Sequence, residues 1–143
     1  MSPMADEKTP SKVPPYLVAA LICDVAVMDP STRKQNLIGI FDQVHVLKFP
    51  AQRAMSVYMK VTDAVGYYPM RIDFVRVDSD ELMARAEGEI NAKDRTKSLD
   101  LHINFPPLPI PSSGRYEFRI HANQMYLGSA FLDAVERIPP QPG

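Results

Sequence analysis

The sequence has no tryptophan, a single cysteine, no long apolar run and no excess of either charge. Without tryptophan, and with six scattered tyrosines, it shows no platform of stacked aromatic rings for a carbohydrate. One cysteine excludes an internal disulfide and a zinc-ribbon pattern. The 16 basic and 17 acidic residues are interspersed, so no basic block could follow a phosphate backbone. Nucleic-acid binding is therefore not expected.

The longest apolar run, from Tyr16 to Cys23, is far shorter than the roughly 20 residues that span a bilayer. Lys8 and Lys12 precede it, so the segment is similar to a bacterial lipoprotein signal in which Cys23 carries the lipid. However, Ile22 stands where signal cleavage requires a small side chain. We expect a cytoplasmic protein in a reducing compartment, without membrane contact, and keep a lipid-anchored envelope protein as the alternative.

Fourteen prolines gather at the two ends of the chain and at a few internal points. Residues 1–15 are polar and proline-rich, which predicts a disordered N-terminal tail, and residues 139–143 predict a flexible C-terminal tail. Residues 16–138 are then one folded domain. A chain of this length can bury a sizeable core without disulfides.

Alternating apolar and polar side chains predict strands between the tails. The alternation is clearest in residues 55–61, 99–105 and 116–120, and strands with one polar face are typical of antiparallel sheets. Residues 16–27 and 36–47 are apolar on both faces, which predicts central strands. About eight strands and no helix predict an all-β fold, a two-sheet antiparallel β-sandwich of the immunoglobulin-like type. A barrel is the alternative.

The proline run from Pro106 to Pro111 lies between two of these strands. Because proline donates no ladder hydrogen bond, the run is predicted to form a bend between sheets, with Leu108 and Ile110 packing on the core. Gly114 and Tyr116 follow, in the pattern of a tyrosine corner, where the hydroxyl bonds to upstream backbone. The alternative is a polyproline II ligand for an aromatic groove.

Four segments together resemble an uncharacterised bacterial family of small single-domain β-sandwich proteins. They are residues 20–27, 36–50, 71–78 and 114–132. The resemblance implies a fold and no assigned reaction, so it provides no functional residues, cofactor or partner.

Asp24 and Asp42 interrupt the two most apolar predicted strands. If these strands form a hairpin centred near Arg33, the two carboxylates face each other and, with His45, could hold a cation or share a proton. The alternative is that each aspartate caps a turn, faces solvent or pairs with an arginine. A register slip of one residue decides between these interpretations.

Other candidate residues have a structural interpretation that we favour. Tyr67 and Tyr68 could be exposed interaction residues, although packing at a strand start explains them as well. Cys23 could be a nucleophile, but a thiol inside an apolar strand is generally inert.

The sequence contains no nucleophile elbow, no phosphate-binding loop and no zinc motif, so we expect a non-enzymatic protein without a cofactor. The favoured function is a protein-interaction or structural module, binding a protein partner or associating with itself through an edge strand or an apolar sheet face. The alternatives are a small cation-dependent enzyme or ligand-binding protein using Asp24, Asp42 and His45, and the lipid-anchored protein.

Overall fold

The structure is a computed structural model that describes residues 9–137. Nine strands make up most of this range: β1 Tyr16–Met28, β2 Gln35–Ile40, β3 Gln43–Val46, β4 Ala51–Thr62, β5 Gly66–Arg76, β6 Glu81–Ala92, β7 Leu99–Ile110, β8 Gly114–Ala122 and β9 Met125–Glu136. Residues 1–8 of the expected N-terminal tail, the expected C-terminal tail and residue 138 of the expected domain lie outside the described residues.

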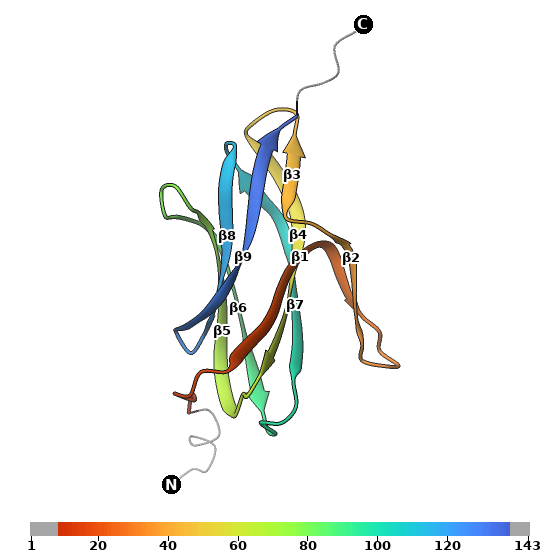
Figure 1. Cartoon of the computed structure of the whole chain (residues 1–143), viewed down its shortest axis with the longest axis vertical. Helices are drawn as coiled ribbons and strands as arrows, with labels where there is room; N and C mark the ends of the chain where they lie inside the picture. The colour runs from red at the N-terminus through yellow and green to blue at the C-terminus, as the bar shows by residue number, and fades with distance from the viewer. Residues whose placement is uncertain (1–8, 138–143) are drawn as a thin grey trace, which may run out of the picture.

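The strands form two sheets packed face to face, in the orders β2-β1-β4-β7 and β3-β9-β8-β5-β6 (Figure 1). The predicted all-β sandwich is confirmed. All strand pairs are antiparallel except β3 and β9, which run parallel. This exception arises because the chain leaves the first sheet after β2 and enters the second sheet at β3.

The core confirms the inward rows that the alternation predicts. Met55, Val57, Met59 and Val61 of β4 are buried, and they face Tyr116, Phe118 and Ile120 of the other sheet across the core. Phe74 stacks on Tyr116 with ring centroids 5.4 Å apart and lies 4.8 Å from Phe118. Burial of these large side chains stabilises the packing of the two sheets.

The segment 36–47, predicted as one central strand, is two strands in different sheets. Gly39 has a φ of 70°, and the backbone of the next residues links the sheets. The Phe41 amide donates to the carbonyl of Ile22 in β1 at 3.0 Å, and the carbonyl of Asp42 accepts from the Asp133 amide in β9 at 2.9 Å. The prediction failed because apolar composition does not show which sheet a strand joins.

The proline run is not a bend between sheets, which corrects the prediction. Pro109 pairs with Gln52, and Ile110 pairs with Ala51, so β7 continues through the run to Ile110. A register shift in β4 between Arg53 and Met55 accommodates the adjacent prolines. The run fits in a sheet because β7 is an edge strand, where a proline nitrogen that faces away from β4 removes no ladder bond. Leu108 and Ile110 are buried in the core, as expected.

Residues 9–13, which the composition placed in a disordered tail, instead bind the start of β5. The Ser11 amide donates to the carbonyl of Tyr67 at 2.8 Å, and the Asn123 side chain donates to the carbonyl of Ser11 at 2.8 Å. The Tyr68 hydroxyl donates to the carbonyl of Val13 at 2.7 Å. The ordered chain therefore begins before residue 16.

Candidate functional site

The β1–β2 hairpin carries an exposed apolar surface. Val25 pairs with Ile38, and Cys23 pairs with Ile40, so their side chains share one face together with Val27. The exposed fractions are 37% for Val25, 49% for Val27, 57% for Ile38 and 58% for Ile40. We call these four residues the hairpin row. They correct the prediction that both segments are central, because β2 is an edge strand and its isoleucines face solvent.

The base of the hairpin is fixed by Asp24, Gly39 and Arg53. The Asp24 side chain lies across Gly39, where an added Cβ would come within 2.2 Å of the Asp24 carboxylate. Asp24 then forms an ion pair with Arg53 at 2.6 Å, and the Arg53 guanidinium lies 4.6 Å from the centre of the Phe41 ring. The absence of a side chain at residue 39 therefore lets a charged pair close the hairpin base.

The far half of the hairpin is attached to β7. The Asn104 side chain accepts from the amide of Ala26 and donates to its carbonyl, both at 3.3 Å. His102 Nδ1 lies 2.7 Å from the Gln35 side-chain oxygen. These contacts replace the β4 ladder, which ends at the Cys23–Ser56 pair. Figure 1 shows the end of the hairpin projecting from the side of the sandwich.

A cleft of about 460 Å³ adjoins the hairpin row where β1 and β9 approach each other. Asp42 is its one ionisable lining residue, and most of the rest are apolar. It is lined by Ala20, Leu21, Ile22, Ile40, Phe41, Asp42, Ser129, Ala130 and Phe131. Ile40 belongs both to the hairpin row and to this lining, so the row and the cleft are continuous.

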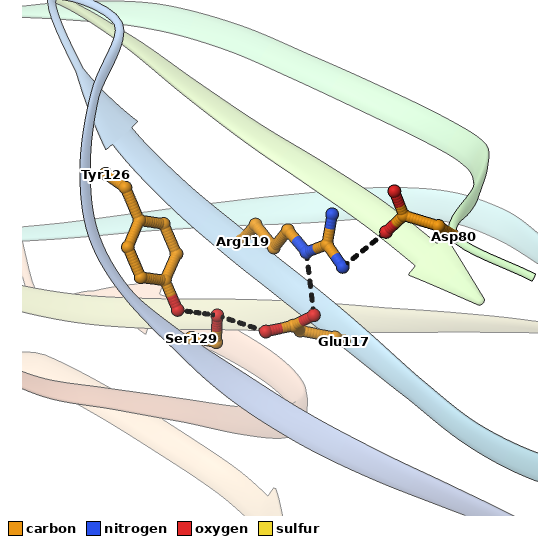
Figure 2. A network of polar contacts seen from close by, with 5 residues as sticks. All are labelled: Asp80, Glu117, Arg119, Tyr126 and Ser129. Atoms are coloured by element: carbon orange, nitrogen blue, oxygen red, sulfur yellow. Dashed lines mark hydrogen bonds and ion pairs between the residues drawn. The ribbon is translucent and has the colours of Figure 1, made fainter. Parts of the chain in front are cut away.

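The outer face of the five-stranded sheet differs from this region, because many of its charged side chains form ion pairs with one another. Arg119 contacts Glu117 and Asp80, each at 2.7 Å, and Glu117 also accepts from the Ser129 hydroxyl at 2.6 Å. The hydroxyls of Ser129 and Tyr126 are 2.6 Å apart (Figure 2). The hydrogen bonds to Glu117 and then to Asp80 raise the pKa of Arg119. These polar side chains already bond to one another, so they are less available to bind a partner.

A second group of ions on the same face surrounds Asp73. This carboxylate, 8% exposed as a residue, forms ion pairs with Arg85 at 2.7 Å and Arg71 at 3.3 Å. Burial, and next the charge of Arg71, lower the pKa of the neighbouring His121. Residues of opposite charge lie two positions apart on β5 and on β8, so they share one face and can pair. This spacing is the signal in the sequence that points to these ion clusters.

The predicted acidic pair does not assemble. Met28 pairs with Gln35, so the hairpin is centred between Ser31 and Thr32 rather than near Arg33. This register places Asp24 opposite Gly39, three residues away from Asp42.

His45 lies in β3, where it pairs with Val135 of β9. Within residues 9–137 no group of three or more histidine, cysteine, aspartate or glutamate side chains is arranged to hold a metal ion.

The two tyrosines at the start of β5 have different environments. Tyr68 is fully buried, and its hydroxyl also accepts from the Val65 amide and the Ser11 hydroxyl, both at 3.1 Å. Packing, and not exposure, explains Tyr68. The Tyr67 hydroxyl donates to Glu89 at 2.9 Å, which raises the pKa of Tyr67.

Cys23 and Tyr116 are both buried. Desolvation, and next the charge of Asp24, raise the pKa of the Cys23 thiol, which disfavours the nucleophilic thiolate. The Tyr116 hydroxyl donates to the carbonyl of Ser112 at 2.8 Å, the kind of upstream backbone contact that defines a tyrosine corner. Gly114 has a φ of 138° and begins β8. In residues 9–137, no helix is long and apolar enough to cross a bilayer.

Comparison with known proteins identifies a family to which no function is assigned. No curated protein matches the sequence. Among solved structures, one similar chain is a glycosyl hydrolase family 2 member from Bacteroides cellulosilyticus DSM 14838, with 9% sequence identity and a TM-score of 0.43. The similarity covers 59% of the present chain and only 13% of the hydrolase, so it carries no argument about activity. Residues 18–134 match the model of a family of unknown function, and the chain therefore belongs to that family, DUF6941.

Proposed function

We propose that the protein is a non-enzymatic interaction module that binds a protein partner through the hairpin row and the adjoining cleft. The observation that carries this proposal is the exposure of four β-branched side chains on one projecting hairpin. Contiguous exposed apolar surface is costly in water, and it is typical of interaction sites when polar groups surround it. Lys34 and Asp42 flank β2 and supply such a rim.

The paired charges of the other sheet support this choice of surface. A partner bound there would have to separate or desolvate ion pairs such as Arg119–Glu117 and Arg85–Asp73. The hairpin row has no such cost, because its side chains carry no polar groups. Binding there gains free energy from the burial of apolar area alone.

The geometry gives less support to the alternatives. The Asp24 carboxylate is bound by Arg53, and the register separates it from Asp42, so a shared cation-dependent site has no assembled ligand set. Lipid attachment at Cys23 requires cleavage after Ile22. Such cleavage would remove the part of β1 that pairs with β4 from Tyr16 onward.

We also infer an immunoglobulin-like arrangement and a cytoplasmic location. The first is supported by the Tyr116–Ser112 hydrogen bond at the start of β8 in a two-sheet sandwich. The second is supported by the balanced charge and by the single, buried cysteine. The bacterial origin rests on the family resemblance of the sequence.

Site-specific photocrosslinking in the native cell tests the proposal. A photoreactive phenylalanine analogue replaces Ile38 in one strain and Leu82 in another, since Leu82 is a comparably exposed apolar residue, 47% exposed, on the edge strand β6. We expect discrete protein adducts from residue 38 and none from residue 82. Equal adducts from both positions, or no adduct from residue 38, would contradict the proposal. The adduct mass distinguishes a second copy of the chain from another protein.

A further inference from the structure

The two sheets have four edge strands among the described residues, and three of them carry features that prevent pairing with another chain. β7 contains Pro106, Pro107 and Pro109. β6 alternates charged residues along most of its length, and β3 has only four residues. Proline, charge and short length are the devices by which edge strands avoid adding a further strand.

The remaining edge strand, β2, has none of these protections. Its sequence, QNLIGI, contains no charge and no proline. In the described chain β2 has one strand neighbour, β1, so its other edge is free to pair. Ile38 and Ile40 are more than half exposed beside this edge. Because an unpaired strand edge is best satisfied by another strand, the occupant of this edge is an extended segment.

The charges that flank β2 indicate which segment fits. Lys34 precedes the strand and Asp42 follows it, and both lie four positions from Ile38. Both are exposed, and within residues 9–137 neither side chain forms an ion pair. In an antiparallel pair of two β2 strands centred on Ile38, residues 36–40 of the two copies pair, and Lys34 of each copy lies just beyond the end at which Asp42 of the other copy leaves the strand. The strand is therefore complementary to itself in both charge and apolar character.

We propose that two copies of this chain associate through antiparallel pairing of their β2 strands about a two-fold axis at Ile38. The pairing joins the two four-stranded sheets into one continuous sheet. It places Ile38 against its symmetry mate at the centre and forms a Lys34–Asp42 ion pair at each end. The end of the hairpin projects from the side of the sandwich, so a second copy can approach the β2 edge from outside (Figure 1). This proposal rests on the proposed function and identifies the partner as a second copy.

The expected affinity is modest, because a pair of short strands buries less surface than a standard interface of about 1,600 Å². We therefore expect a dissociation constant in the micromolar range, roughly 1 to 100 µM. The affinity should fall as salt rises, since the two ion pairs are exposed to solvent.

Sedimentation velocity of the full chain over roughly 1 to 500 µM tests the proposal. We expect a monomer–dimer equilibrium. Ile38→Lys, which places two like charges at the two-fold axis, should abolish the dimer across this range. Leu82→Lys on the protected edge strand β6 is the matched control and should leave the equilibrium unchanged. Circular dichroism of each variant verifies that the sheet signal is retained.

The proposed Lys34–Asp42 ion pairs between the two copies are tested separately. Lys34→Glu and Asp42→Lys should each weaken the dimer on the order of tenfold, because each introduces two like-charge pairs. The double variant should restore the affinity by exchanging the two charges.

Three results would overturn the dimer proposal: a monomer at every concentration, a dimer that persists in Ile38→Lys, or a double variant as weak as the single ones. If the chain is monomeric yet residue 38 crosslinks to another protein in the cell, the dimer is wrong and the proposed function stands. If both experiments are negative, both proposals fail.

Discussion

Gly39 determines whether the base of the hairpin can close. Its φ of 70° is unfavourable for residues with a side chain, and Asp24 occupies the space where a Cβ would project. Two independent constraints therefore act on one position. Either constraint alone would favour glycine, and together they link a local backbone conformation to the Asp24–Arg53 ion pair.

Gly39→Ala should destabilise the protein by about 1–3 kcal/mol, because alanine is strained at this φ and displaces the Asp24 carboxylate. Chemical denaturation measures the free energy of unfolding. Gly88→Ala is the matched control: its Cβ would meet no atom within 4 Å, and we expect little change. Adding Asp24→Ala to Gly39→Ala should relieve the steric part, so that the two changes cost less together than their sum. Strict additivity would contradict the contact.

Tyr116→Phe should lower the free energy of unfolding by about 1–2 kcal/mol, because it removes a buried hydrogen bond and leaves its carbonyl acceptor unsatisfied. The tyrosine is fully buried, and its hydroxyl contacts Ser112 at the last turn before β8. Tyr67→Phe serves as the control, because its hydroxyl binds the exposed Glu89 carboxylate and its loss should change stability little. Equal denaturation midpoints for Tyr116→Phe and the wild type would remove the tyrosine-corner role.

His121 should make stability depend on pH. Burial lowers the pKa of His121 below its ordinary value of 6.5, so the unfolded chain binds the proton more readily than the folded chain. The contribution of the neutral form is complete above about pH 6.5 and is lost as the pH falls towards the lowered pKa. His121→Gln should therefore lose less stability than the wild type between about pH 7.5 and about pH 5.5. Parallel pH profiles for the two proteins would show that His121 does not contribute.

Among the secondary-structure elements, alternation of apolar and polar side chains predicted a strand wherever one face of that strand is polar. Leu99 to Phe105 in β7 and Tyr116 to Ile120 in β8 show this, because a polar face gives each strand an unambiguous orientation. The β1–β2 hairpin is a region where alternation does not show which face is buried. Its two strands are apolar on both faces, and no local pattern distinguishes a buried central strand from an exposed apolar edge.

The candidate site could not be predicted for a related reason. The position opposite Asp24 depends on the centre of the turn at residues 29–34, and an error of one and a half residues there moves the pairing by three. The turn is held by local contacts, including the Arg33 amide donating to the carbonyl of Asp29 at 2.7 Å. Composition indicates that such a turn exists but does not fix its centre.

The segment 9–13 is an element that alternation did not reveal, and its contribution to stability can be measured. The Tyr68 hydroxyl donates to Val13 and accepts from Ser11, so removing residues 1–13 takes away both partners. Tyr68→Phe should cost about 1–2 kcal/mol in the full chain and less in the chain that begins at residue 14. A double-mutant cycle by urea denaturation gives the coupling, which we expect to be about 1 kcal/mol. A coupling of zero would show that the segment is not bound in solution.

At the scale of the whole molecule, the order of the strands separates a protected centre from a less protected periphery. β5 lies between β8 and β6, β8 lies between β9 and β5, and β4 lies between β1 and β7. These three strands also contribute the largest buried side chains, including Phe74 and Phe118. β2 is held by one neighbour, and its far end is attached through a few side-chain contacts. The hairpin is therefore the part most able to open without unfolding the sandwich.

Native-state hydrogen exchange of a dilute, monomeric sample should show this division. Amides of β4, β5 and β8 should exchange slowest, near the limit set by global unfolding, because opening them exposes the aromatic core. Amides of β2 should exchange at least about tenfold faster, since they are released when the hairpin alone opens. Asn104→Ala, which removes the side chain bonded to both backbone groups of Ala26, should accelerate exchange in residues 25–28 and 35–38 and leave β8 unchanged. Equal protection of β2 and β8, or a loss of protection spread over both sheets in Asn104→Ala, would mean that the hairpin and the sandwich open as one unit.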